Sequence, residues 1–165
     1  DGQLSLDAQH AIAGILGRIR EISLFLNPLP SSYQRLGCWE APKRINWSFG
    51  NRSQLVRIPA AHPGAGRMEL RSPDPACNPY LAFALVLAAA MEGITEVTPL
   101  QAPLDDSGSL PESLEEAISL AEKSAFIREV LPENVIEAYL AEKKKTAARF
   151  EADANAVFQQ HLRTI

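Results

Sequence analysis

The segment that most constrains the fold is PYLAFALVLAAAM, residues 79–91, which carries no charged side chain. Asn78 and Pro79 form a typical helix start, because an asparagine side chain can cap free backbone N–H groups and proline suits the first helical position. Gly93 is a typical C-terminal cap. Apolar residues fall on nearly every side of this predicted helix, so we expect it to be the buried central helix. The segment is too short to span a bilayer, and no membrane partner is expected.

The segments before this helix predict a helix followed by a small sheet. Apolar residues at helical spacing predict a helix over 6–26, with Ser5 as its N-cap and Pro28 ending it. Alternating apolar residues predict short strands, with a turn at Gly50-Asn51 between the first two. We expect these strands to form a small antiparallel sheet, and they lie within residues 43–49, 53–59 and 67–71.

The second half of the chain is predicted to be helical. Ser113 to Glu116 form a capping box that opens one helix. Further helices are predicted over 125–130 and from Pro132 onward. With no internal repeat or linker in the sequence, residues 1–165 are expected to form one α+β unit, a small antiparallel sheet packed with helices and followed by a helical half.

The composition excludes several classes of protein. A chain of 165 residues with 46% hydrophobic and 22% charged residues is an ordinary globular domain. Its two cysteines, Cys38 and Cys77, form no zinc spacing and fit a reducing compartment, so we expect a cytoplasmic protein. The three histidines are scattered and predict no metal cluster.

Positive charge is concentrated in one part of the chain. Between Arg35 and Arg71 there are seven basic and two acidic residues, a net charge of +5, whereas the whole chain carries −4. Six of the seven basic residues are arginine, which binds carboxylates and phosphates through two parallel hydrogen bonds. We therefore expect an anionic small ligand. Nucleic acid is not expected, because a pI near 5.4 gives no broad basic surface.

The sequence RMELR, residues 67–71, lies at the end of this basic region. As a strand it places Arg67, Glu69 and Arg71 on one face and Met68 and Leu70 on the other. Two interpretations remain open from these residues alone. The charged face is either a solvated surface or a ligand site in which the arginines hold anions and the glutamate holds a metal.

Several separated blocks of the chain resemble the C-terminal part of the catalytic domain of glutamine synthetase. They occur in the family's order, and the opening helix and the segments LPESLEEAISL and LPENVIEAYLAEKK resemble the family as well. The resemblance implies a fragment that lacks the family's N-terminal domain and upstream catalytic strands. The three main blocks are NPLPSSYQRL, WEAPKRINWSFGNRSQLVRIPA and RMELRSPDPACNPYLAFALVLAAAMEGI.

The resemblance also implies an activity. The family joins glutamate and ammonia to form glutamine through γ-glutamyl phosphate, with ATP as co-substrate and Mg²⁺ or Mn²⁺ at the phosphates. The residues of this chain that match the family's site are, by role, the metal ligand Glu69, the substrate-binding Arg35 and Arg71, the catalytic Glu40 and Arg52, and the nucleotide-binding Arg52, Arg57 and Arg67.

The implied partners are glutamate, ammonia, ATP, the missing N-terminal part and adjacent subunits of a ring-shaped homo-oligomer, so the fragment alone is expected to be inactive. Two departures from the family pattern leave alternatives open. The loop from Arg35 to Glu40 is one residue shorter than usual, and Trp39 stands where a tyrosine is common. A γ-glutamyl-amine ligase of the polyamine type and a non-catalytic binding or regulatory relative remain alternatives.

Overall fold

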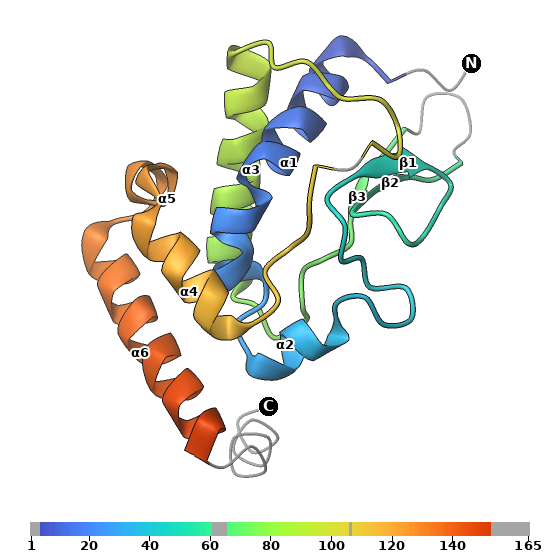
Figure 1. Cartoon of the computed structure of the whole chain (residues 1–165). Coiled ribbons are helices and arrows are strands. Elements are labelled where there is room, and N and C mark those ends of the chain that lie inside the picture. Colours follow the sequence, from blue (N-terminus) through green and yellow to red (C-terminus); the bar gives the residue numbers. More distant parts are fainter. Residues whose placement is uncertain (1–3, 61–65, 106, 153–165) are drawn as a thin grey trace.

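The computed structural model describes residues 4–60, 66–105 and 107–152, and it confirms the α+β class (Figure 1). A small three-stranded sheet lies beside a group of helices. Among the described residues, no helix combines the length and the apolar character needed to cross a membrane. In chain order the elements are α1 (Leu6–Leu26), α2 (Pro30–Arg35), β1 (Trp47–Phe49), β2 (Val56–Ile58), β3 (Glu69–Leu70), α3 (Pro79–Thr95), α4 (Leu114–Lys123), α5 (Ala125–Val130) and α6 (Glu133–Ala152).

The central helix is α1, which begins and ends at the predicted residues. The Ser5 hydroxyl accepts a hydrogen bond from the Ala8 N–H over 3.2 Å, and this bond caps the first turn as expected. Twelve of the 21 residues of α1 are buried, because α1 packs against both α3 and α4 (Figure 1). The core of the protein is therefore built around α1.

The backbones of α1 and α3 nearly touch where the two helices cross. A Cβ atom added to Gly14 would overlap the carbonyl oxygen of Ala89 and lie 2.8 Å from the backbone nitrogen of Gly93. The prediction that Gly93 caps α3 is wrong, since the helix continues to Thr95. Gly93 serves the close approach instead, because any side chain would push the helices apart.

An ion pair joins the same two helices. Arg18 of α1 donates from Nε and Nη2 to the two carboxylate oxygens of Glu92, over 2.6 and 2.7 Å. Arg18 also donates to Glu21 over 2.9 Å, and its guanidinium lies 4.9 Å from the ring centre of Phe126 in α5. The hydrogen bond from Arg18 is the main reason that the pKa of Glu92 lies below its ordinary value.

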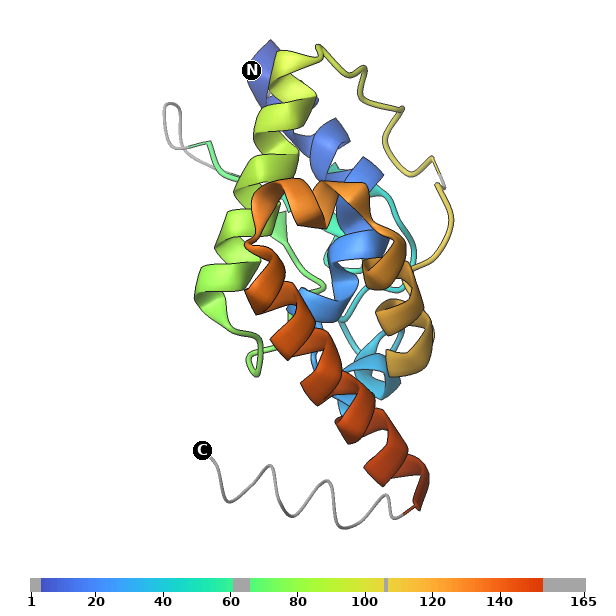
Figure 2. The same cartoon turned by 90° about the vertical axis from the view of Figure 1, so that its left-hand side faces the viewer.

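The prediction that α3 is buried on all sides is wrong for one of its faces. Leu85 and Ala89 face α1 and are fully buried. The opposite face is open, because α3 lies at the edge of the helical group, and among the described elements its further close contacts are with α5 (Figure 2). We call the open face the α3 stripe; its residues and exposed fractions are Tyr80 at 83%, Phe83 at 66%, Leu87 at 62% and Met91 at 58%.

The sheet has the order β1-β2-β3 and is mixed, which corrects the prediction of an antiparallel sheet. β2 pairs antiparallel with β3, but it pairs parallel with β1, with Trp47 opposite Val56. Parallel strands ordinarily need a long crossover connection. Here β1 has only three residues. The six residues 50–55 are therefore long enough to bring the chain from the end of β1 back to its first residue, where β2 begins.

The C-terminal helices largely follow the prediction. The Ser113 hydroxyl accepts a hydrogen bond from the Glu116 N–H over 3.2 Å, as a capping box requires, while the Glu116 carboxylate accepts from the N–H of Glu112 over 2.9 Å. α5 has the predicted bounds, and α6 begins directly after Pro132. The short helix α2 was not predicted from the sequence.

Candidate functional site

Glu69 lies at the centre of a cluster of arginines on β2 and β3. The antiparallel register places Glu69 opposite Arg57, whose Nη1 donates to Glu69 Oε2 over 2.8 Å. Arg67 and Arg71 approach the same carboxylate, each at 3.5 Å, so all three charged residues of RMELR lie on one side as expected. The hydrogen bond from Arg57 is the main cause that lowers the pKa of Glu69. This carboxylate is therefore held in its ionised form.

Arg71 connects the sheet to the loop that carries Glu40. Its Nε donates to the carbonyl oxygen of Arg52 over 2.8 Å, and its Nη2 donates to the carbonyl oxygen of Glu40 over 3.2 Å. The Glu40 carboxylate lies 3.6 Å from Arg71 and 3.4 Å from Arg52. Only 19% of the Arg71 side chain is exposed, so this guanidinium is fixed in place by the backbone around it.

The loop around Glu40 is a compact turn. The Gly37 N–H donates to the carbonyl oxygen of Ala41 over 2.9 Å, and the Ala41 N–H donates back to Cys38 over 3.0 Å. Trp39 has a φ of 53°, in the left-handed region that bulky residues rarely adopt, and its side chain is fully exposed. The turn thus holds an indole ring in solvent directly before Glu40.

Arg35 makes its polar contacts away from the Glu69 cluster in the part of the chain that the structure describes. It donates to the side-chain oxygen of Asn27 over 3.2 Å and to the carbonyl oxygen of Ser72, and its Nε lies 3.6 Å from the Asp74 carboxylate. Three polar atoms of this group are buried without a hydrogen-bond partner among the described residues: Arg35 Nε, Asn27 Nδ2 and Ser72 Oγ. Each of the three can donate a hydrogen bond.

Sequence reasoning missed Asn27, Ser72 and Asp74, although each of the three directly precedes a proline. Asn27 precedes Pro28 at the end of α1, and Asp74 lies between two prolines in SPDP. The Asp74 carboxylate also accepts a hydrogen bond from the Ala76 N–H over 2.8 Å, so the turn itself aims this side chain. The sequence signal that could have predicted them is a polar residue directly before a proline, close to the start or end of a segment that resembles the family.

The charge of the Glu69 cluster suits anions. Two glutamates face four arginines, so its net charge is +2; the arginines are Arg52, Arg57, Arg67 and Arg71. The described residues hold no group of three or more histidine, cysteine, aspartate or glutamate side chains that could bind a metal ion. A single carboxylate among guanidiniums supplies only one of the several oxygen ligands that a divalent cation needs, so the described residues by themselves provide no complete metal site.

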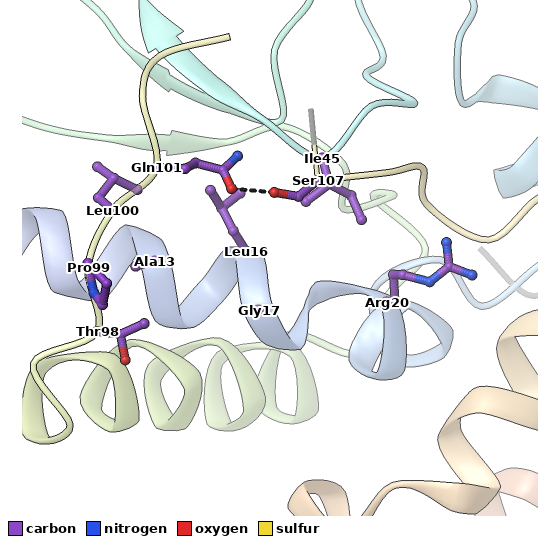
Figure 3. A pocket seen from close by; sticks show the side chains of 10 residues that line it. All are labelled: Ala13, Leu16, Gly17, Arg20, Ile45, Thr98, Pro99, Leu100, Gln101 and Ser107. Carbon is purple, nitrogen blue, oxygen red and sulfur yellow. Dashed lines mark hydrogen bonds between the residues drawn. The ribbon is translucent and has the colours of Figure 1, made fainter. Parts of the chain in front are cut away.

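A separate cavity lies between α1 and the loop after α3 (Figure 3). Its volume is about 320 Å³. Three of the four polar side chains on its wall already have partners, since Ser107 donates to Gln101 and Arg20 pairs with Glu116 over 2.8 Å. No convergent polar groups point into this cavity within the described ranges, so it does not compete with the arginine cluster as a candidate site.

Comparison with known proteins identifies the class. Residues 1–160 match the family model described as the catalytic domain of glutamine synthetase, a ligase family. The chain is 43% identical to the glutamine synthetase of Methanosarcina mazei, over 91% of this chain and 37% of that protein. It is 38% identical to the glutamine synthetase of Thermotoga maritima, over 89% of this chain and 37% of that protein.

A solved structure of GmaS in complex with ADP has a similar fold. Its TM-score is 0.79 at 30% identity, and the match covers 93% of this chain and 39% of that one. The chain therefore belongs to the glutamine synthetase family and carries a part of its catalytic domain. It spans about 37% of the length of the two relatives named above.

Proposed function

We propose that this chain is the C-terminal part of an ATP-dependent ligase that joins glutamate and ammonia through γ-glutamyl phosphate. The observation that supports this most is the convergence of four arginines from three segments on two glutamates. Transfer of a phosphoryl group needs little covalent chemistry from the protein. It needs positive groups that are already in place where negative charge develops.

The proposed roles follow the family match residue by residue. Arg52, Arg57 and Arg67 neutralise the phosphates of ATP, and Arg52 also stabilises the charge of the phosphoryl group during transfer. Arg71 binds the substrate. Its guanidinium is held in place by the carbonyl oxygens of Arg52 and Glu40 and by the carboxylate of Glu69. Glu40 closes the site and accepts a proton from ammonium, because it lies on a loop that reaches the cluster.

Arg35 is the second substrate-binding residue in this proposal. Its support is the group of buried donors around it, namely Arg35 Nε, Asn27 Nδ2 and Ser72 Oγ, which have no partner among the described residues. Buried donors of this kind cost free energy unless an acceptor pairs with them. The carboxylate of glutamate is such an acceptor.

In this proposal the metal site is shared between these 165 residues and the rest of the full-length enzyme. Glu69 would supply one oxygen ligand for Mg²⁺ or Mn²⁺, and the other carboxylates would come from outside these residues. The missing N-terminal part and adjacent subunits of a ring-shaped oligomer complete the site. We therefore expect the 165-residue chain alone to be inactive, and the whole protein to act in the cytoplasm.

A chimera tests this proposal. The segment of the Methanosarcina mazei enzyme that matches this chain is replaced by the 165 residues, and glutamate-dependent phosphate release from ATP is measured with ammonium. We expect turnover, and more than a tenfold loss, about 1.4 kcal/mol of activation free energy, for Glu69→Gln and for Arg71→Lys. The control Arg128→Lys changes an exposed pair with Glu133 on the helical side and should change turnover less than twofold.

The outcomes separate the alternatives. A folded chimera of the parent's oligomeric size that lacks turnover would favour the non-catalytic relative. A γ-glutamyl-amine ligase is the second candidate, because the exposed Trp39 beside Glu40 could offer its ring face to an alkylammonium group. Faster turnover with polyamines than with ammonium, reversed by Trp39→Tyr, would favour that candidate.

A further inference from the structure

The turn between β1 and β2 holds the two least exposed guanidiniums of the Glu69 cluster. Only 17% of the Arg57 side chain and 19% of the Arg71 side chain are exposed, against 62% for Arg52. Arg57 donates from Nε to the carbonyl oxygen of Gly50 over 3.0 Å, and Arg71 donates from Nε to that of Arg52 over 2.8 Å. The directions of these two carbonyls therefore set the positions of both guanidiniums.

The carbonyl that holds Arg57 is fixed by the backbone alone. A carbonyl and the N–H that follows it belong to one planar peptide unit and point in opposite directions, so a partner for the N–H also fixes the carbonyl. The Gly50 carbonyl shares its unit with the N–H of Asn51, which donates to the carbonyl oxygen of Phe49 over 2.8 Å. The hold on Arg57 thus depends on no side chain of the turn.

The carbonyl that holds Arg71 depends on a side chain instead. It belongs to Arg52 and shares its peptide unit with the N–H of Ser53, which donates to Oδ1 of Asn51 over 2.9 Å. Asparagine and aspartate form such an Asx turn because their side-chain oxygen reaches the N–H two residues further along. Without this bond the peptide unit can rotate and turn its carbonyl away from Arg71, while the Cα of Arg52 stays in place.

We propose that Asn51 is a positioning residue for Arg71, which it orients through the peptide unit between Arg52 and Ser53. The consequence for catalysis rests on the proposed function, in which Arg71 binds the substrate glutamate. The alternative is that Asn51 only stabilises an exposed turn. In that case its loss would loosen Arg57 and Arg71 alike, so Arg57 is the internal reference for the test.

The first test needs no catalysis. NMR spectroscopy of the 165-residue chain measures how fast each arginine Nε–H exchanges with water, which reports whether the group keeps its acceptor. Asn51→Ala removes the acceptor of the Asx turn and should speed exchange at Arg71 about tenfold, with less than about a twofold change at Arg57. Asn51→Asp keeps an oxygen at this place and should stay within about threefold of the wild type. Asn134→Ala, the same change at an exposed asparagine of α6, is the matched control.

Three outcomes of the exchange measurement would overturn the proposal. The first is equally fast exchange at Arg71 in the wild type and in Asn51→Ala. The second is an equal rise at Arg57 and Arg71, because Asn51 would then act on the turn as a whole. The third is an Asn51→Asp variant that exchanges as fast as Asn51→Ala, because the side-chain oxygen would then not be what matters.

The second test connects the position of Arg71 to the substrate. In the chimera described above, Asn51→Ala should raise the KM for glutamate about tenfold and change the KM for ATP less than about twofold. Asn51→Asp should restore the KM for glutamate. An unchanged KM for glutamate, or an equal rise for ATP, would overturn the role in substrate binding. A chimera without turnover, together with the expected exchange rates, counts against the proposed reaction alone and supports Asn51 as the residue that positions Arg71.

Discussion

The helices α1 and α3 lie side by side, and the less apolar of the two is the more deeply buried. α1 carries Asp7, Arg18, Arg20 and Glu21, yet twelve of its residues are buried. α3 carries one charged residue, Glu92, yet four of its large apolar side chains are more than half exposed. The extent of packing around a helix decides its burial: α1 packs extensively against both α3 and α4, whereas α3 packs extensively against α1 and only lightly against α5. Apolar side chains without such packing form an exposed apolar patch.

The largest effect is expected from closing the gap between the two helices. Gly14→Ala should abolish the cooperative thermal transition, because its methyl group would overlap the backbone of α3 and separate the helices that form the core. Gly17→Ala is the matched control on α1, since nothing lies within 4 Å of its added Cβ. That substitution should stabilise the chain by about 0.5–1 kcal/mol. Scanning calorimetry of both variants decides, and a normal transition for Gly14→Ala would show that the helices can move apart.

The second expected effect distinguishes the two faces of α3. Leu85→Ala should lower the free energy of unfolding by about 2–5 kcal/mol, because Leu85 is fully buried against α1. Leu87→Ala should change it by less than about 0.5 kcal/mol in the 165-residue chain, since that side chain is largely in solvent. Urea titration measures both values. Equal losses would mean that the stripe is already covered in solution.

The smallest expected effect concerns the ion pair between α1 and α3. The pKa of Glu92 is lowered in the folded protein, so this pair stabilises the fold above the ordinary carboxyl pKa, and the contribution is lost as pH falls through the lowered pKa. Because 37% of the Arg18 side chain is exposed, we expect the contribution to be about 1 kcal/mol or less.

Urea titrations of the wild-type chain and of Glu92→Gln between pH 7 and pH 3 measure this contribution. The difference in stability should shrink toward low pH. Glu21, which also faces Arg18, is present in both proteins, as are Glu69 and Glu112, whose pKa values are lowered elsewhere. A difference that grows as the pH falls would contradict the assigned role of the pair.

The sequence alone determined the features that depend on neighbours along the chain. The bounds of α1 and α5 follow from helical spacing and from caps such as Ser5, because capping acts within one turn. The side of the strand that Arg67, Glu69 and Arg71 share follows from the period of two. Their roles as ligands of metal, nucleotide and substrate stay predictions, because in this structure the three side chains contact other residues of the chain.

Only the tertiary structure decided which surfaces meet. In the folded chain Arg57 lies opposite Glu69, and β1 and β2 are parallel. Arg35 contacts Asn27 and Asp74, and α1 is the central helix. Each of these depends on segments far apart in the sequence, and local patterns carry no information about such distances. Gly93 illustrates the reason: its sequence context is that of a helix cap, but the backbone of α1 lies against it and leaves no space for a side chain.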